Sequence, residues 1–308
     1  MIKAKIVADS IGPTGIRLTT YEVTYPRFIH AELMTHRAFS RNAASSRAIP
    51  IEKMMKRIFS EMATPERWGI NGKGMQDHGE ASKTRRFFAK LVWRLAGYSA
   101  LFFVWLLSKL KIHKQIANRI SEPFSHITVI ITADQFGLAN MFAQRDHKDA
   151  QPEFRVLARK MWVAYNLSNP TVLKNGEWHL PYITRIDRDE VFNHWYDGPV
   201  TPAQAIEILK KISVGRCARV SYLNHDGVRH LKDDLKLCER LMSSNPGHWS
   251  PFEHVAQAIT VPAASGNIRG FRQYRKDFEN EFINALTTWN PLDYEDELDE
   301  FHHVPKGD

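Results

Sequence analysis

Hydrophobic and polar residues alternate along the first part of the chain in the pattern typical of β-strands. Residues 2–11 and 16–26 carry this alternation, with a turn at Gly12–Gly15 between them and Pro26 as a stop. Residues 126–133 form a third apolar run of strand length. Two weaker candidates lie further along the chain: a strand at 253–262, and either a short strand or a helix end at 217–223.

Helical spacing of apolar residues dominates the rest of the chain. It predicts helices at 28–41, 82–119, 134–167, 201–212, 233–242 and 267–286. The Gly-rich residues 68–79 are expected to form a loop, and the Pro- and Asp-rich residues 169–202 a connector. The order of elements predicts an α+β fold whose mixed or antiparallel sheet is flanked by long helices. The connector suggests two halves, 1–172 and 173–308.

Composition places the chain among ordinary globular proteins. Its 308 residues can bury one large core or two smaller ones. Two cysteines, Cys217 and Cys238, are too few for a secreted disulfide framework. The first residues hold no apolar run of signal-peptide length, so the expected location is the cytoplasm.

The apolar residues 87–110 test this expectation of a soluble protein. Their longest uncharged piece, Leu95–Ser108, is bracketed by Arg94 and Lys109 and is shorter than the roughly 20 residues that a membrane helix needs. A buried helix is therefore favoured over one that touches a membrane, and no membrane partner is expected.

Charge is unevenly distributed along the chain. The formal net charge is +8, no acid occurs between Lys83 and Arg119, and residues 293–300 are mostly acidic. A field of this kind attracts nucleotides, phosphorylated cofactors or a nucleic acid backbone.

Hydrogen-bond donors are concentrated in residues 35–50, THRAFSRNAASSRAIP, which contain no acid. Guanidinium groups and hydroxyls suit a phosphate dianion. A plainer interpretation stays open: His36 and Arg37 could cap a helix end, and Ser45 and Ser46 could only form a turn.

The spacing H-R-x-x-S-x-N-x-x-S-x-R, which starts at His36, resembles the signature of flavin-dependent thymidylate synthases. Two further blocks of that family have counterparts. Residues 134–154 carry Asn140, Arg145 and the Ala-Gln-x-Glu that ends at Glu153, and residues 218–222 and 247–254 read ARVSY and GHWSPFEH. This last block precedes the His-Arg motif in the family and comes last here. The order indicates a circular permutation or a trimmed duplication, and residues 268–281 resemble a degenerate second His-Arg helix.

The resemblance implies an enzyme that methylates C5 of dUMP to give dTMP, with FAD as cofactor and methylenetetrahydrofolate and NADPH as co-substrates. Its expected partners are a pyrimidine deoxynucleotide and other copies of the chain, as a homodimer or homotetramer. One alternative is hydroxymethylation, or methylation of another pyrimidine nucleotide such as dCMP. A second alternative is a non-catalytic nucleotide or nucleic acid binding protein on the same fold, although nucleic acid is an unlikely partner of the enzyme.

The resemblance also implies roles for individual residues. Ser45, Ser46 and Arg47 would hold the nucleotide phosphate, with Ser45 also catalytic, and Glu32 would face the base. Arg145 would support the charge that builds on the pyrimidine carbonyl, although a surface ion pair with Asp149 is a plainer role. Positions that match flavin-holding residues are His36, Arg37, Asn140, Ser221, His248, Ser250 and Glu253. The histidines and cysteines form no spacing typical of metal ligands, so no metal site is predicted.

Several positions depart from the family pattern. Thr35 stands where the family usually has Arg, Glu32 where it has Gln, and Asn118 where another Arg approaches the nucleotide. Ala43 and Ala48 replace an acid and a Tyr. Either Arg272 or Arg275 of the degenerate copy supplies the missing charge, or the substrate differs from dUMP.

Overall fold

A five-stranded sheet forms the centre of the molecule. The computed structural model describes residues 1–195, 198–220, 230–244 and 247–281. The strand order is β3-β4-β2-β1-β5, and all pairs are antiparallel except β1 with β5. The sheet is thus mixed, and the expectation of an α+β architecture is confirmed. The strands are β1 (Lys3–Ile11), β2 (Arg17–Pro26), β3 (Ser40–Ala43), β4 (His126–Asp134) and β5 (Thr171–Val172).

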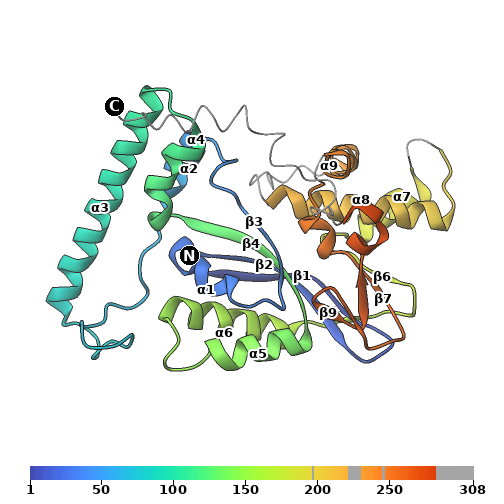
Figure 1. Cartoon of the computed structure of the whole chain (residues 1–308), viewed down its shortest axis with the longest axis horizontal. Coiled ribbons are helices and arrows are strands. Elements are labelled where there is room, and N and C mark those ends of the chain that lie inside the picture. The colour runs from blue at the N-terminus through green and yellow to red at the C-terminus, as the bar shows by residue number, and fades with distance from the viewer. Residues whose placement is uncertain (196–197, 221–229, 245–246, 282–308) are drawn as a thin grey trace, which may run out of the picture.

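Helices α5 (Gln135–Arg145) and α6 (Pro152–Leu167) lie against one face of this sheet (Figure 1). Their apolar residues join strand residues in the largest core cluster, where Tyr21 and Phe154 are fully buried. The predicted single helix over 134–167 is wrong, because the chain breaks at 146–151. Pro152 begins α6, where its missing N–H costs no hydrogen bond.

The predicted helix over 28–41 is also wrong. A 3-10 turn, η1 (Arg27–Ile29), and a short helix, α1 (His30–Met34), are followed by β3. β3 pairs with the otherwise open edge of β4, with Ser40 opposite Thr132. The Arg41 side chain donates to the carbonyl of Met34, which ends α1. The hydrogen bonds between β3 and β4 and this cap stabilise the strand more than the helical spacing of the apolar residues would stabilise a helix.

Four helical elements stand at one end of the sheet, at the left of Figure 1. They are α2 (Ile51–Ser60), α3 (Lys83–Lys109), α4 (Lys114–Ala117) and the 3-10 segment η2 (Asn118–Phe124). Leu101 of α3 joins a small core cluster with Met54 and Ile58 of α2. The expectation that α3 is buried is wrong: only 22% of its most apolar window is buried. By length and composition alone, α3 is a helix that can cross a membrane.

The described part of the C-terminal half consists of three α-helices, short 3-10 segments and short strands. Helix α7 (Arg185–Asn193) lies inside the predicted connector, whereas α8 (Pro202–Arg219) and α9 (Leu231–Ser243) match predicted helices and extend them. Arg216 of α8 is buried between Asp187 and Asp234 and pairs with both. The segment predicted as a short strand or helix end at 217–223 is helical through Arg219, and 221–223 lie outside the described residues.

The predicted helix over 267–286 is wrong as far as the structure describes it. This stretch instead forms β9 (Ile268–Arg269), β10 (Phe271–Gln273) and two 3-10 segments, η5 (Tyr274–Asp277) and η6 (Glu279–Glu281). Gly270 lies between the two strands at φ +70, a conformation that a helix excludes. β10 pairs with β7 (Ala256–Ala258), which also pairs with β6 (Trp178–His179), and β8 (Ala264–Ser265) pairs with β9. The division of the chain at 172 stays a prediction.

A line of buried hydrogen bonds joins the C-terminal half to the central sheet. His179 of β6 bonds Ser10 through Nδ1 at 2.9 Å and Thr20 through Nε2 at 2.8 Å. Thr132 of β4 bonds Thr20 at 2.6 Å and the Nδ1 atom of His254 at 2.8 Å. Burial lowers the pKa of His179 to about 4 and, with His179 nearby, that of His254 to about 3. Both imidazoles are therefore neutral in the folded protein at neutral pH.

These two histidines predict an acid-sensitive fold. In the unfolded chain they take up protons near pH 6.5, whereas the folded protein leaves them neutral down to about pH 4 for His179. Their stabilisation is thus present above pH 6.5 and is lost as the pH falls. Each should lower the free energy of unfolding by about 1.4 kcal/mol per pH unit in that window.

Urea unfolding of the wild type and of His179→Gln between pH 6 and pH 5 measures this loss. The variant should show a shallower pH dependence, by about 1.4 kcal/mol per pH unit. His147→Gln, a change at an exposed histidine, should keep the wild-type slope. Equal slopes for the wild type and His179→Gln would mean that His179 carries a proton in the folded state.

Candidate active site

The Arg145 guanidinium is held in one orientation at the end of α5. Its Nε atom donates to His36 Nε2 at 2.9 Å, and its Nη2 atom donates to the Thr35 hydroxyl at 2.9 Å and to the Glu32 carbonyl at 3.3 Å. The guanidinium also stacks over the Phe154 ring, 4.7 Å from its centroid. The Nη1 atom makes no hydrogen bond within the described chain. Arg145 thus offers two fixed donors to a ligand.

His36 can receive this hydrogen bond only as a neutral imidazole with an unprotonated Nε2 atom. Its side chain is buried between Phe39 and Phe154. Burial, followed by the charges of Arg145 and Arg41, lowers its pKa to about 4. The predicted ion pair between Arg145 and Asp149 is absent; Asp149 lies beside His147 instead. The predicted capping role of His36 is absent too, because its imidazole bonds a side chain.

A cavity of about 660 Å³ opens beside this group. It lies between α1, the N-terminus of α6 and the Gly-rich residues 68–79, which the sequence predicts to form a loop. Glu32 lines the cavity, and its Oε2 atom is buried without a hydrogen-bond partner. Other lining residues include Phe28, Arg67, Trp93, Gln151 and Glu153. Glu32 therefore links the two features: its carbonyl accepts a hydrogen bond from Arg145, and its carboxylate lines the cavity, which Arg145 itself does not line.

The loop Ser45–Ser46–Arg47 follows β3. Ala48 N–H donates to the Ser45 carbonyl at 3.0 Å, which makes the turn that the plainer interpretation expected. Ser46 is buried and its hydroxyl donates to Glu122. Arg47 is exposed and forms no ion pair within the part of the chain that the structure describes. Its guanidinium can therefore meet an anion from solvent.

Asn118, which replaces an expected Arg, has a structural role. Its buried amide donates to the carbonyls of Ser46 and Ile49 at 2.8 and 3.0 Å and so shapes the loop. The adjacent Arg119 pairs with Glu122.

The positions matched to flavin-holding residues are spread over both halves. His36 is committed to Arg145, whereas Arg37 and Asn140 are exposed on the N-terminal half. His248 and Ser250 are exposed at the start of η4 (Ser250–Glu253) in the C-terminal half. No described hydrogen bond, ion pair or ring contact joins His248 to Arg145 or Arg47. Ser221 lies outside the described residues.

The degenerate copy and the preceding residue, Asn267, contact the His-Arg motif through side-chain amides and not through arginines. Gln273 donates to the Ser40 hydroxyl at 2.9 Å, and Asn267 donates to the Ala38 carbonyl at 3.0 Å. Arg275 pairs with Glu253 at 2.5 Å and with Glu281, and Arg272 pairs with Asp277. Neither arginine lines the cavity beside Glu32. Within one chain, the copy therefore positions residues 38–40 but adds no charge to that cavity.

The solved structures that are similar to the chain include two of one enzyme. No family model matches the chain, and no curated protein matches it. The crystal structure of a UMP/dUMP methylase PolB from Streptomyces cacaoi bound with 5-Br UMP has a TM-score of 0.46 and 17% identity, over 54% of this chain and 88% of that one. The same enzyme bound with 5-Br dUMP has a TM-score of 0.40 and 19% identity, over 48% and 65%.

Two contributors to the site had no signal that the sequence analysis used. Thr35 was noted only as a departure from Arg, but its hydroxyl accepts from Arg145 and donates to the Glu32 carbonyl at 2.7 Å. Gln273 was passed over because its stretch was expected to be helical.

Among the described residues, no group of three or more His, Cys, Asp and Glu side chains could hold a metal ion.

The Arg145 charge should hold down the pKa of His36. Replacing Arg145 by Gln removes that charge and leaves burial as the main cause, so the pKa should rise from about 4 toward the ordinary range. A pH titration of the His36 ring by NMR, assigned with His36→Gln, measures the change. Arg159→Gln removes an exposed charge that is paired with Asp146 and should leave His36 unaffected. An unmoved pKa in Arg145→Gln would contradict the contact.

Proposed function

We propose that the chain is a flavin-dependent enzyme that methylates C5 of dUMP to give dTMP, with methylenetetrahydrofolate as carbon donor and NADPH as reductant. The observation that carries the proposal is the Arg145 group: two blocks of the flavin-dependent thymidylate synthase pattern, far apart in sequence, meet at one hydrogen-bonded guanidinium. The meeting point lies beside a cavity lined by Glu32. A fixed guanidinium next to a hollow suits a reaction that builds negative charge on a carbonyl.

Arg145 would act on the pyrimidine itself. Attack by C5 on the one-carbon unit requires electron density to move through the ring, and the density is stabilised when a cation faces the ring carbonyl. His36, Thr35 and Glu32 hold the guanidinium before substrate binds, so its orientation costs little on binding. The two Nη1 donors are the ones left for the substrate.

Arg47 and the Ser45 hydroxyl would hold the nucleotide phosphate. Arg47 is exposed and carries no ion pair in the described chain, and a guanidinium suits phosphate oxygens. Ser46 is buried against Glu122, so Ser45 is the better candidate of the two serines. Asn118 would support this loop from below.

Within one chain, only some of the positions that match flavin-holding residues are free to bind FAD. Arg37, Asn140, His248 and Ser250 are exposed and polar, as a bound dinucleotide requires, but Glu253 is already paired with Arg275. We therefore assign the first four to flavin and leave Glu253 as the partner of Arg275. Reduced flavin supplies the two electrons that turn the transferred carbon into a methyl group. Since no described hydrogen bond, ion pair or ring contact joins Arg37 to His248 within one chain, a homodimer or homotetramer that brings them together is part of the proposal.

The proposal is tested first by colour and product. Purified protein should carry, or take up, FAD with an absorbance that NADPH bleaches, and should convert dUMP to a product heavier by one methylene. Colourless protein that FAD cannot reconstitute would instead favour a non-catalytic nucleotide-binding protein. A product heavier than dUMP by CH2O would replace methylation by hydroxymethylation.

Arg145→Ala should remove turnover but leave flavin bound. Loss of the charge that stabilises the transition state should lower kcat by about 10²- to 10³-fold, while flavin absorbance and KM for the folate stay near wild type. Single-turnover kinetics with reduced enzyme measure the step. Arg159→Ala, at an exposed pair with Asp146, is the matched control. Wild-type turnover in Arg145→Ala would show that another group carries this role.

A second candidate substrate is dCMP, and Glu32 favours it. The buried Oε2 atom has no partner in the described chain, and a carboxylate only accepts hydrogen bonds. The amino group of cytosine donates to such an acceptor, whereas uracil has an acceptor oxygen at that position. A glutamine, the residue that the family pattern has here, can donate instead.

Glu32→Gln should therefore move the preference toward dUMP. If Glu32 contacts the base, the ratio of kcat/KM for dCMP to that for dUMP should fall by about tenfold or more, because one amide donor replaces an acceptor. Competition between the two nucleotides, with both products weighed, gives the ratio directly. Glu153→Gln changes another carboxylate that lines the cavity and should alter the ratio less. An unchanged ratio in Glu32→Gln would remove Glu32 from base recognition.

A further inference from the structure

One face of α3 presents apolar side chains to solvent along nearly its whole length. We call it the apolar face of α3. It consists of Phe87, Phe88, Leu91, Val92, Leu95, Tyr98, Phe102, Phe103, Trp105 and Leu106, which are between 40% and 65% exposed. The opposite side of the helix is buried through Gly97, Ala100, Leu101 and Val104. In Figure 1 the helix stands at the outer edge of the molecule.

The apolar face is continuous. At 100° per residue, its ten side chains fall within an arc of about 160°. Lys90 and Arg94 lie outside that arc, so no charge interrupts the face between Phe87 and Leu106. A surface helix of a soluble monomer normally directs charged residues to this side. The face therefore needs a cover.

A hollow beside the face extends it onto α2. A cavity of about 540 Å³ lies between the two helices, and its surface is almost entirely carbon. Its lining residues are Met55, Lys56, Phe59, Tyr98, Leu101, Phe102 and Trp105. Phe59 of α2 is itself 70% exposed. An occupant of the face can thus place an apolar group between the helices.

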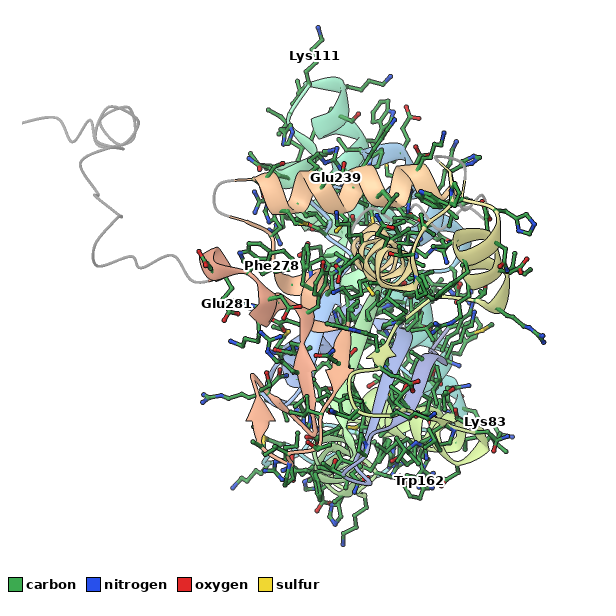
Figure 2. All side chains as sticks on the ribbon, turned by 90° about the vertical axis from the view of Figure 1, so that its right-hand side faces the viewer. Lys83, Lys111, Trp162, Glu239, Phe278 and Glu281 are labelled. Atoms are coloured by element: carbon green, nitrogen blue, oxygen red, sulfur yellow. The ribbon has the colours of Figure 1, made fainter. Side chains whose placement is uncertain are left out.

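Basic residues border the apolar face and acids are excluded from it. Between Glu80 and Glu122 the chain has nine Lys and Arg residues and neither Asp nor Glu. Three of them lie in the first turn of α3 and two at its C-terminal end, whereas Lys90 and Arg94 lie along the helix outside the apolar face. Lys109 lies over the Trp105 ring at 5.8 Å. Figure 2 shows Lys83 at the lower end of the molecule and Lys111 at its top, so positive charge borders the helix at both ends.

We propose that α3 lies in the plane of an anionic lipid bilayer, with its apolar face among the acyl chains and its flanking Lys and Arg residues at the headgroups. Aromatic and aliphatic residues on one face with basic residues at its borders are the composition of interfacial helices. Lysine stems over aromatic rings let the charge reach the headgroups. This replaces the expectation that no membrane contacts the chain, and it does not rest on the proposed function.

Other occupants fit the observations less well. In an antiparallel pair of α3 helices from two copies, the basic end of each helix would face the basic end of the other, with no acid between them. A nucleic acid would need charged side chains on the contact face, which here is apolar. Spanning also fits less well, although the whole of α3 is long enough to cross a bilayer. Leu95–Ser108, the longest uncharged piece, reaches only about 21 Å, against about 30 Å of hydrocarbon, and Leu101 packs on α2.

Vesicle flotation of the full chain tests the proposal. Wild-type protein should float with vesicles of phosphatidylcholine that contain phosphatidylglycerol, and much less with phosphatidylcholine alone. The double variant Phe102→Glu, Trp105→Glu should lower the bound fraction at least about tenfold. Arg85→Gln with Lys109→Gln should weaken binding to the anionic vesicles, as should added salt.

Ile186→Glu is the matched control, because Ile186 is 76% exposed on α7, far along the chain from α3. It should float like the wild type. If the double variant does not fold, Phe103→Glu, which does not line the hollow, provides the same test. Three results would overturn the proposal: no flotation of the wild type, a concentration-dependent dimer that the double variant abolishes without any lipid binding, or binding of single-stranded DNA but not of vesicles.

Discussion

The hydrogen bonds from His179 and His254 to Thr20 and Thr132 are the constraint on which the arrangement of this protein depends. Two imidazoles from the C-terminal half meet two threonines on adjacent strands of the central sheet, and all four side chains are buried. A threonine pair at 2.6 Å links them. A buried polar line of this kind allows one docking position, since a shifted register would leave several polar atoms without partners. It thereby also fixes where β10 contacts the His-Arg motif, at Ser40.

The hydrogen bonds of Arg145 to His36, Thr35 and Glu32 depend on the docking of the C-terminal half on the sheet. Gln273 and Asn267 bond Ser40 and Ala38, and these residues connect β3 to His36. β3 is thus held on one side by β4 and on the other by side chains of the C-terminal half. Because the turn between α1 and β3 is fixed at both ends, His36 and Thr35 face Arg145 without relying on a helix. The same sequence, taken alone, favours a helix there.

The sequence predicts local structure well where one face of an element is covered by its neighbours. β2 and β4 are examples, because their apolar runs are buried on both sides of the sheet. The prediction fails where pairing with a segment far away in the sequence determines the local structure. Apolar spacing over 267–286 is helical, but pairing of β10 with β7 and the turn at Gly270 prevail. Whether α3 is buried cannot be predicted either, since the pattern that packs a core helix also suits a helix lying on lipid.

In the site, the motifs identified Arg145 and His36 but assigned them to different ligands, whereas the structure bonds them to each other.

That bond gives the site its electrostatic character. A neutral imidazole, a hydroxyl and a carbonyl orient Arg145 but do not neutralise it, and no described carboxylate pairs with it. The full positive charge is thus retained a few ångströms from the backbone of Glu32, whose carboxylate oxygen is likewise without a partner. A buried acceptor without a partner is costly until a donor reaches it. Under the proposed function, a pyrimidine base would turn a carbonyl toward the Nη1 donors of Arg145 and a donor toward the Glu32 carboxylate.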